Sequence, residues 1–248
     1  MHNSSYKKAE YFLSTYFNND SVLKKNVLEV GSKSYHSQDT YRNLFNEENY
    51  IYTGLDIESG NNVDYVPENI FIWSELEDNS FDIIISGQTF EHNPYFWVTF
   101  LEIARVLKPG GYAFICAPGG GKVHRYPVDC WRFYPDSWSA LCQFAGLNLI
   151  ESYFEPDSHI GLIGDAKWRD SAAIAQKPNL SGDALKTFND NIKNVTKSLS
   201  DRVYFKKEDI FHRKWVKEYE KSIKRGGFKS LIAVIRRKMA GSHVKIYK

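Results

Sequence analysis

The sequence is poor in several features that define particular classes of protein. It has only three cysteines, Cys116, Cys130 and Cys142, which form no CxxC pair and no even framework. This pattern argues against a disulfide scaffold and a structural zinc site, and it favours a reducing compartment, so we expect a cytoplasmic protein. The longest apolar runs have about five residues, whereas a membrane-spanning helix needs roughly 20. The first residues, MHNSSYKKAEYF, also contain no apolar signal core.

The whole chain has almost no net charge, but its two parts carry opposite net charges. The 248 residues carry 32 Lys and Arg against 30 Asp and Glu, a net +2. Residues 201–248 hold 15 basic and 5 acidic residues, a net +10, so the first 200 residues carry a net −8. With 42% apolar and 25% charged residues, the composition is that of a globular protein.

The basic end of the chain has apolar residues at helical spacing, which predicts a helical extension. Three interpretations stay open: docking on the domain or on a second copy in a homodimer, a basic amphipathic helix on an anionic membrane surface, or binding to an acidic partner. Nucleic-acid binding is not expected, because no recognisable module is present and the rest of the chain is acidic. The apolar positions are Phe228, Leu231, Ile232, Ile235 and Met239.

Short apolar runs alternate with helical patterns along most of the chain. This alternation predicts an α/β domain with a largely parallel sheet. Lys108-Pro109-Gly110-Gly111 is a stop-and-turn signal. We expect a capping helix within residues 1–26, the α/β domain over 27–178 and the basic helical extension over 179–248. The expected strands are 27–30, 50–55, 63–66, 81–86, 112–117, 147–154 and 171–176, and the expected helices are 3–19, 38–48, 95–107 and 135–145.

Two positions after predicted strands suit an adenosine ligand. Gly31, followed by Ser32, allows close approach of the backbone to a ligand. Asp56, 25 residues further on, is placed to accept both hydroxyls of a ribose, although a turn former or helix cap would look the same. The GxGxxG fingerprint is absent, so the pair indicates adenosine without a pyrophosphate.

Longer stretches resemble a known family. VLEVGS, YTGLD, NSFDIIISGQTFEH and EIARVLKPGGYAFICAP are similar to the class I S-adenosylmethionine-dependent methyltransferases of the type 11 methyltransferase-domain group. The resemblance runs from about Val27 to Gln176, and Arg105–Gly111 is its most specific part. It departs in the first loop, where Gly31-Ser32-Lys33 replaces the usual G-x-G. It implies a Rossmann-like class I methyltransferase fold with a mostly parallel seven-stranded sheet, helices on both faces, and S-adenosylmethionine as cofactor.

The resemblance also implies roles for individual residues. Glu29 and the backbone around Gly31 and Ser32 would face the methionine part of the cofactor, while Asp56 would bind the ribose hydroxyls. Ile57 would pack on the adenine, and the Glu68-Asn69 pair would hold its amino group. The cofactor near its sulfonium would be lined by Ser86, Gly87 and Gln88.

A polar segment after the fifth strand, HRYPVDCWRFYPD, is similar to a stretch found in a subgroup of these methyltransferases. We interpret it as an acceptor-binding loop in which His124 or Asp129 takes a hydroxyl proton. His92 is a third candidate base. The guanidinium groups of Arg125 and Arg132 suit an anionic acceptor. The remaining predicted substrate-binding residues are these two arginines, Tyr126 and Trp131. The alternative is a self-packed loop with Trp131 and Phe133 in the core and Asp129 paired to an arginine. No spacing requires a metal.

Together these features predict an S-adenosylmethionine-dependent methyltransferase. Its acceptor would be a small polar molecule, anionic or sugar-type, methylated on oxygen, with surface-polysaccharide biosynthesis as one setting. Two alternatives stay open: a non-catalytic cofactor-binding regulatory subunit, and a membrane-surface methyltransferase of a lipid-linked acceptor.

Overall fold

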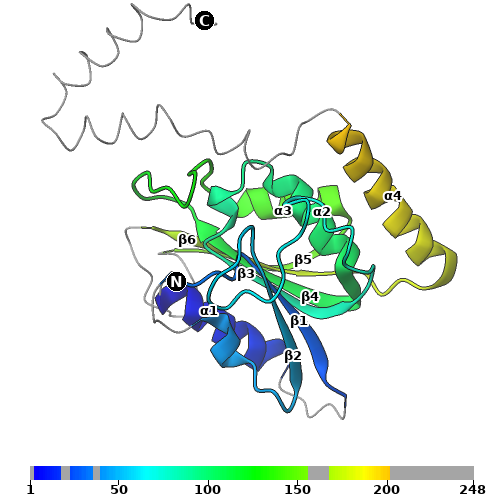
Figure 1. Cartoon of the computed structure of the whole chain (residues 1–248), viewed down its shortest axis with the longest axis horizontal. Coiled ribbons are helices and arrows are strands. Elements are labelled where there is room, and N and C mark those ends of the chain that lie inside the picture. Colours follow the sequence, from blue (N-terminus) through cyan, green and yellow to red (C-terminus); the bar gives the residue numbers. More distant parts are fainter. Residues whose placement is uncertain (1–2, 18–22, 36–39, 156–167, 202–248) are drawn as a thin grey trace, which may run out of the picture. The chain divides into compact units, whose positions relative to one another are not determined.

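One β-sheet carries the domain in the computed structural model (Figure 1). The structure describes residues 3–17, 23–35, 40–155 and 168–201, which all lie in a compact unit spanning residues 1–207. Within these residues the sheet has six strands in the order β2-β1-β3-β4-β6-β5. They are β1 (Lys25–Val30), β2 (Tyr50–Leu55), β3 (Phe81–Gly87), β4 (Leu107–Pro118), β5 (Asn148–Phe154) and β6 (Asp170–Gln176).

The sheet is mostly parallel, which confirms the predicted Rossmann-like fold. Strands β2, β1, β3 and β4 pair in parallel, and β6 is inserted antiparallel between β4 and β5. The chain runs outward from β1 to β2 and then returns to the other side of β1 with β3. This reversal creates a switch point between β1 and β3, where open α/β sheets bind their ligands beyond the carboxyl ends of the strands.

Helices cover both faces of the sheet (Figure 1). The helix α1 (Asn3–Tyr16) lies on one face, and α2 (Phe96–Val106), α3 (Pro135–Ala145) and α4 (Gly182–Ser200) lie on the other. In β3, Ile83 and Ile85 pack in the core with Phe12 of α1, while Ile84 packs with Phe100 of α2. Burial on both sides explains why this strand is a continuous apolar run rather than an alternating one.

The predicted strand at residues 63–66 is wrong. Here the chain forms only an isolated parallel bridge between Leu55 and Tyr65. The Asp64 carboxylate accepts the Gly54 N–H at 2.7 Å, and the Gly54 carbonyl oxygen accepts the N–H groups of both Asp64 and Tyr65. Because these bonds saturate one residue of β2, and Pro67 has no N–H to give, no ladder develops.

Two further expectations differ locally. Lys108–Gly111 belongs to β4 instead of forming a separate turn: the register of β4 against β3 shifts between Phe81 and Ile83, and Gly110 has φ +75°. The expected helix at 38–48 is a short 3-10 helix, η1 (Tyr41–Leu44), in its described part. By contrast, α3 begins at Pro135 and ends before Gly146, as predicted.

Part of the predicted extension packs on the domain. In α4, Ile192 is buried in the core that α2 and α3 share, and Asn189 accepts a hydrogen bond from the buried Lys177 at 3.1 Å. The predictions for the basic end, namely a membrane-surface helix or a dimer contact, concern residues 202–248, which lie outside the described residues. None of the helices in the described ranges has the length and apolar character needed to cross a bilayer.

Candidate functional site

The loop after β1 begins with a glycine that no other residue replaces easily. Gly31 has φ +80°, and a Cβ added there would lie 2.1 Å from the Thr89 hydroxyl oxygen beyond β3. The two loops of the switch point therefore touch at this glycine. The N–H groups of Gly31 and Ser32 both bond to the Leu55 carbonyl oxygen at the end of β2, which fixes the path of the loop.

Asp56 lies directly after β2 and is held by the neighbouring backbone. Its Oδ2 accepts the Lys33 N–H at 2.9 Å and its Oδ1 accepts the Ile57 N–H at 2.7 Å. Burial raises the pKa of this carboxyl group, although the backbone hydrogen bonds oppose the rise. Each carboxylate oxygen can accept more than one hydrogen bond, so the group fits the two hydroxyls of a ribose. The predicted ribose role of Asp56, and the adenine contact of half-buried Ile57, stay predictions.

Glu29 is buried near the end of β1. Its Oε2 accepts hydrogen bonds from the Tyr52 hydroxyl and, at 2.8 Å, from the Asn62 amide. Burial raises the pKa of Glu29 to about 7, and the two hydrogen bonds oppose the rise. A cation placed beside it would favour the ionised form, which suits the ammonium group of the methionine part of the cofactor.

The end of β3 supplies the other wall of the switch point. The buried Ser86 hydroxyl donates to the Val30 carbonyl oxygen at 2.8 Å, and a Cβ on Gly87 would collide with the Tyr41 ring. Gln88 has φ +57°, and its amide nitrogen donates to Asp170 at 3.1 Å. The Ser32 hydroxyl and the Gln88 amide oxygen are buried without a hydrogen-bond partner among the described residues. Such orphaned polar atoms fit a polar ligand at the predicted cofactor position.

The structure gives Glu68 and Asn69 local contacts. The Glu68 N–H donates to Glu75 at 3.1 Å, and the Asn69 amide oxygen accepts the N–H groups of Phe71 and Ile72. Asn69 thus holds a turn of its own segment. Their predicted contact with the adenine stays a prediction.

The structure brings the three predicted catalytic residues together beyond β3. His92 ends the short 3-10 helix η2 (Phe90–His92), and its ring centroid lies 4.8 Å from that of His124. His124 Nδ1 lies 3.4 Å from Asp129 Oδ2, and the His124 N–H donates to the same oxygen at 2.7 Å. Residues 32 positions apart in the chain, on different loops, therefore form one cluster beside Gly87 and Gln88.

Asp129 is also paired with an arginine, as the alternative interpretation of this loop expected. Its two oxygens accept from both terminal nitrogens of Arg132, with the NH2–Oδ2 distance at 2.8 Å. Burial alone would raise the pKa of Asp129, but the Arg132 guanidinium and the His124 N–H hold it below its usual value. Asp129 stays ionised in this arrangement and bonds the His124 backbone, with the His124 ring nitrogen Nδ1 close by but not hydrogen-bonded to it among the described residues.

Glu91 completes the cluster, and sequence reasoning assigned it no role. Its side chain is fully buried, and neither carboxylate oxygen has a hydrogen-bond partner among the described residues. Burial raises the pKa of Glu91 to about 8, whereas burial lowers the pKa of His92 to about 4 and also lowers that of His124. Both imidazoles are therefore neutral at pH 7. The only sequence signal was the adjacency of Glu91 and His92.

The aromatic residues of the acceptor loop divide into two groups. Phe133 is buried and stacks on Trp138 at 4.9 Å, while Trp131 is partly exposed and donates its indole N–H to the Asn93 carbonyl oxygen at 3.0 Å. Tyr126 is 57% exposed, with its ring 6.0 Å from that of His92. The ring of Trp168 lies 4.4 Å from His124 on the other side. The self-packed alternative therefore holds for Phe133 but not for Trp131. Arg125, Tyr126, Trp131 and Arg132 remain predicted acceptor contacts.

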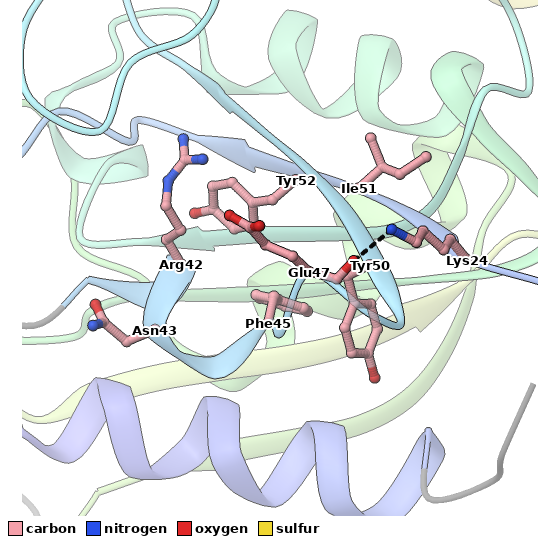
Figure 2. A pocket seen from close by; sticks show the side chains of 8 residues that line it. All are labelled: Lys24, Arg42, Asn43, Phe45, Glu47, Tyr50, Ile51 and Tyr52. Carbon is pink, nitrogen blue, oxygen red and sulfur yellow. Dashed lines mark hydrogen bonds between the residues drawn. The ribbon is translucent and has the colours of Figure 1, made fainter.

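A surface pocket lies elsewhere, at the outer edge of β2 (Figure 2). Its wall includes Arg42 and Tyr52, whose guanidinium and ring lie 4.4 Å apart, and Lys24 closes one end by donating to the Glu47 carbonyl oxygen at 2.6 Å. None of the predicted site residues lines it. Two of its residues connect it to the switch point: Tyr52 donates to Glu29, and Arg42 donates to Asn62, which in turn donates to Glu29 and to the Ser32 carbonyl oxygen.

The strand order, the loop at the switch point and the acidic residue after β2 together define the class I methyltransferase fold. Residues 36–115 match the family described as methyltransferase domain. The matched segment is about a third of the chain, and together with the fold it supports a methyltransferase of the S-adenosylmethionine-dependent class. The match begins after the first loop, whose Gly31-Ser32-Lys33 sequence departs from the family pattern. No curated protein matches the sequence.

Solved structures share the fold at low sequence identity. The CurJ carbon methyltransferase aligns with a TM-score of 0.54 at 14% identity, over 70% of this chain and 54% of that one, so this chain spans about half its length. The Burkholderia thailandensis 1,6-didemethyltoxoflavin-N1-methyltransferase, solved with S-adenosylhomocysteine, gives 0.50 at 15% identity over 70% and 78%. The cyclase SpnF gives 0.50 at 15% over 70% and 80%. The fold alone therefore does not fix the reaction.

Proposed function

We propose that this methyltransferase transfers the methyl group to an oxygen of a small polar acceptor of the anionic or sugar type. One observation carries the proposal: His124, on the loop after β4, meets Glu91 and His92, which follow Ser86, Gly87 and Gln88 closely in the chain. Those three residues are the predicted neighbours of the reacting methyl group. Proton-accepting side chains thus stand where an acceptor hydroxyl would meet the methyl donor.

The chemistry requires an in-line displacement and the removal of one proton. A new O–CH₃ bond forms as the S–CH₃ bond breaks, S-adenosylhomocysteine leaves, and the hydroxyl proton needs an acceptor. His124 is the proposed base, because its ring is neutral at pH 7 and its Nδ1 faces Asp129 at 3.4 Å. This pairing of a base with an orienting carboxylate leaves Nε2 to take the proton. Asp129 is then a positioning residue.

The acceptor class rests on the charges of the loop. Arg125 lies next to His124 in the chain, and Tyr126 exposes a phenol beside His92, so both suit an anionic or hydroxylated molecule. Arg132 is already paired with Asp129 and contributes less to binding. A setting in surface-polysaccharide biosynthesis, and a cytoplasmic location, are consistent with such an acceptor and with the cysteine pattern.

A panel assay tests this proposal. The full-length chain is incubated with S-adenosylmethionine and uronic acids, sugar phosphates and nucleotide sugars, and release of S-adenosylhomocysteine is measured. We expect acceptor-dependent release that falls about 100-fold in His124→Ala, with binding of S-adenosylhomocysteine unchanged. Asp136→Asn, at an exposed carboxylate in the first turn of α3 where the same segment ends, is the control and keeps full activity. Equal release by His124→Ala and the control would contradict the assignment of the base.

A further inference from the structure

The Glu91 carboxylate is an unusual group to find in a protein interior. It is fully buried, and both of its oxygens lack a hydrogen-bond partner among the described residues. A buried carboxylate without a partner is costly unless a proton or a cation compensates its charge. Two ring nitrogens lie close to it, His92 Nε2 at 3.4 Å and His124 Nε2 at 3.8 Å from Glu91 Oε1.

Both imidazoles are oriented in the same way relative to Glu91. The other ring nitrogen of each has an acceptor nearby: His92 Nδ1 is hydrogen-bonded to the Val128 carbonyl oxygen at 2.5 Å, whereas His124 Nδ1 lies 3.4 Å from Asp129 Oδ2 without a hydrogen bond among the described residues. With the proton on Nδ1, each ring turns an Nε2 lone pair toward Glu91. Metal-binding histidines show this arrangement, because an acceptor behind the ring fixes its tautomer and orientation.

We propose that Glu91, His92 and His124 bind one divalent transition-metal ion through a carboxylate oxygen and two Nε2 atoms. Each residue offers one ligand atom, and these three atoms all lie within 4.8 Å of one another. Ligands about 2.0–2.1 Å from a tetrahedral zinc ion are separated by about 3.4 Å. The two histidine nitrogens lie 3.4 and 3.8 Å from the Glu91 oxygen, and the ligand atoms all lie within 4.8 Å of one another, so binding an ion requires the two rings to move closer together. Two histidines and one carboxylate are a donor set that suits Zn²⁺, Fe²⁺ or Co²⁺ and not Mg²⁺ or Ca²⁺.

The charges around the cluster agree with a cation. The Arg132 guanidinium would repel an incoming ion, but both its terminal nitrogens are bonded to Asp129, so the two charges largely cancel. Once its proton leaves, Glu91 then gives the cluster an excess negative charge. The polar surroundings of His124 and the partly exposed ring, at 23%, leave a side from which an ion and a further ligand can enter.

Three protein ligands leave at least one coordination position open. An acceptor hydroxyl bound there would lose its proton more readily, because a divalent ion lowers the pKa of a bound oxygen. The proton would pass to solvent at the partly exposed side of the cluster, since the three side chains that bind the ion could not take it. In the metal-bound enzyme the ion would thus replace His124 as the group that activates the acceptor. This role rests on the proposed function, whereas binding of the ion itself does not.

Cobalt spectroscopy tests the site without any methyl transfer. Full-length protein is stripped with a chelator and titrated with Co²⁺, whose visible absorption is intense in a tetrahedral or five-coordinate site. We expect one Co²⁺ per chain to produce these bands, and Zn²⁺ to displace it. Glu91→Gln keeps the shape of the side chain and removes the charge, so the bands should disappear or affinity should fall at least tenfold.

Two further variants make the result specific. His124→Ala alters a partly exposed ring, so a correctly folded variant is expected, and it should also lose the bands. Glu10→Gln, on the exposed side of α1, is the matched control and should behave as the unmodified chain. The proposal is overturned if the unmodified chain shows no bands, or if the bands persist in Glu91→Gln, since the ion would then bind elsewhere. Binding of S-adenosylhomocysteine, measured on the same samples, reports separately on the proposed function.

Discussion

Glu29 has a pKa near 7, because burial outweighs the hydrogen bonds from Tyr52 and Asn62. If the cofactor's ammonium group binds beside it, the proton on Glu29 must leave first at lower pH. Affinity for S-adenosylhomocysteine should therefore rise with pH up to about 7 and then level off. The slope approaches tenfold per pH unit well below that value, and calorimetry between pH 5 and pH 8 measures it.

Glu29→Gln separates this linkage from other pH effects. The variant has no proton to release, so its affinity should be weaker at pH 7.5 and should change less between pH 5 and pH 7. Glu58→Gln, a partly exposed carboxylate paired with Lys33, is the control and should retain the full slope. A slope that survives in Glu29→Gln would place the titrating group elsewhere.

At this scale the sequence identified residue types better than their partners. Gly31, Asp56, His92, His124 and Asp129 all lie at the switch point or the cluster beyond it, since they directly follow strands that the apolar pattern revealed. The pairing of Asp129 with Arg132 was only one of two interpretations, because spacing does not show which cation a carboxylate meets. The sequence could not predict that the Glu91 carboxylate is buried without a hydrogen-bond partner among the described residues, since this burial depends on loops distant in the chain.

Among the helices and strands, α2 is tied to the loop before β3 by one arginine. Arg105 is buried and bonds to Glu102 at 2.7 Å, to Asp78 at 2.8 Å and to the Trp73 carbonyl oxygen at 2.6 Å. This gives the Arg105–Gly111 stretch a structural meaning in addition to its resemblance to the family. The turn predicted within that stretch corresponds to an interruption inside β4, since Lys108–Gly111 have no partner in β3 between the pairs Phe81–Leu107 and Ile83–Tyr112.

Arg105→Ala should lower the free energy of unfolding by about 3–5 kcal/mol, because it leaves the Glu102 carboxylate buried and unpaired. Lys193→Ala is the matched control, since Lys193 also pairs with Asp78, at 2.6 Å, but is 51% exposed. Its loss should cost less than about 1 kcal/mol. Urea unfolding of both variants measures the difference. Similar losses in the free energy of unfolding would show that the buried Arg105 stabilises the protein no more than the exposed Lys193.

The contact between the loops after β1 and β3 gives a second prediction for this scale. Gly31→Ala should destabilise the protein more than Gly182→Ala. Both residues have positive φ, at +80° and +55°, but only at Gly31 does an added Cβ meet another side chain. The shared backbone strain is about 1–2 kcal/mol, and the collision with Thr89 adds to it. Thermal unfolding compares the unfolding temperatures of the two variants. Equal decreases would mean that the contact between Gly31 and Thr89 adds nothing to the backbone strain.

On the scale of the whole molecule, the net charge of +2 is a cancellation between a domain with an acidic excess and a basic end. All predicted cofactor and acceptor residues lie within the described residues of the compact unit 1–207. A chain shortened after Lys207 should therefore bind S-adenosylhomocysteine within about twofold of the full-length affinity. Calorimetry on both chains tests this, and a large loss would mean that the basic end takes part in the site.

The basic end also admits a test of its membrane interpretation. Flotation with anionic vesicles compares the full chain with the same chain lacking residues 226–248, where the apolar and basic residues alternate at helical spacing. Binding that disappears with this segment and weakens with salt would support a peripheral membrane contact. Flotation that does not change on deletion would leave docking on the domain or on a second copy as the interpretation.

We infer that the switch point between β1 and β3 binds the methyl donor through Asp56. Titration of the full-length chain with S-adenosylhomocysteine in a calorimeter tests it most directly. We expect one site per chain. Asp56→Ala should lower its affinity for S-adenosylhomocysteine about 10- to 100-fold, because hydrogen bonds to a charged group are lost, and Glu58→Gln should leave the affinity unchanged. No binding to the unmodified chain, or equal affinity in Asp56→Ala, would contradict it.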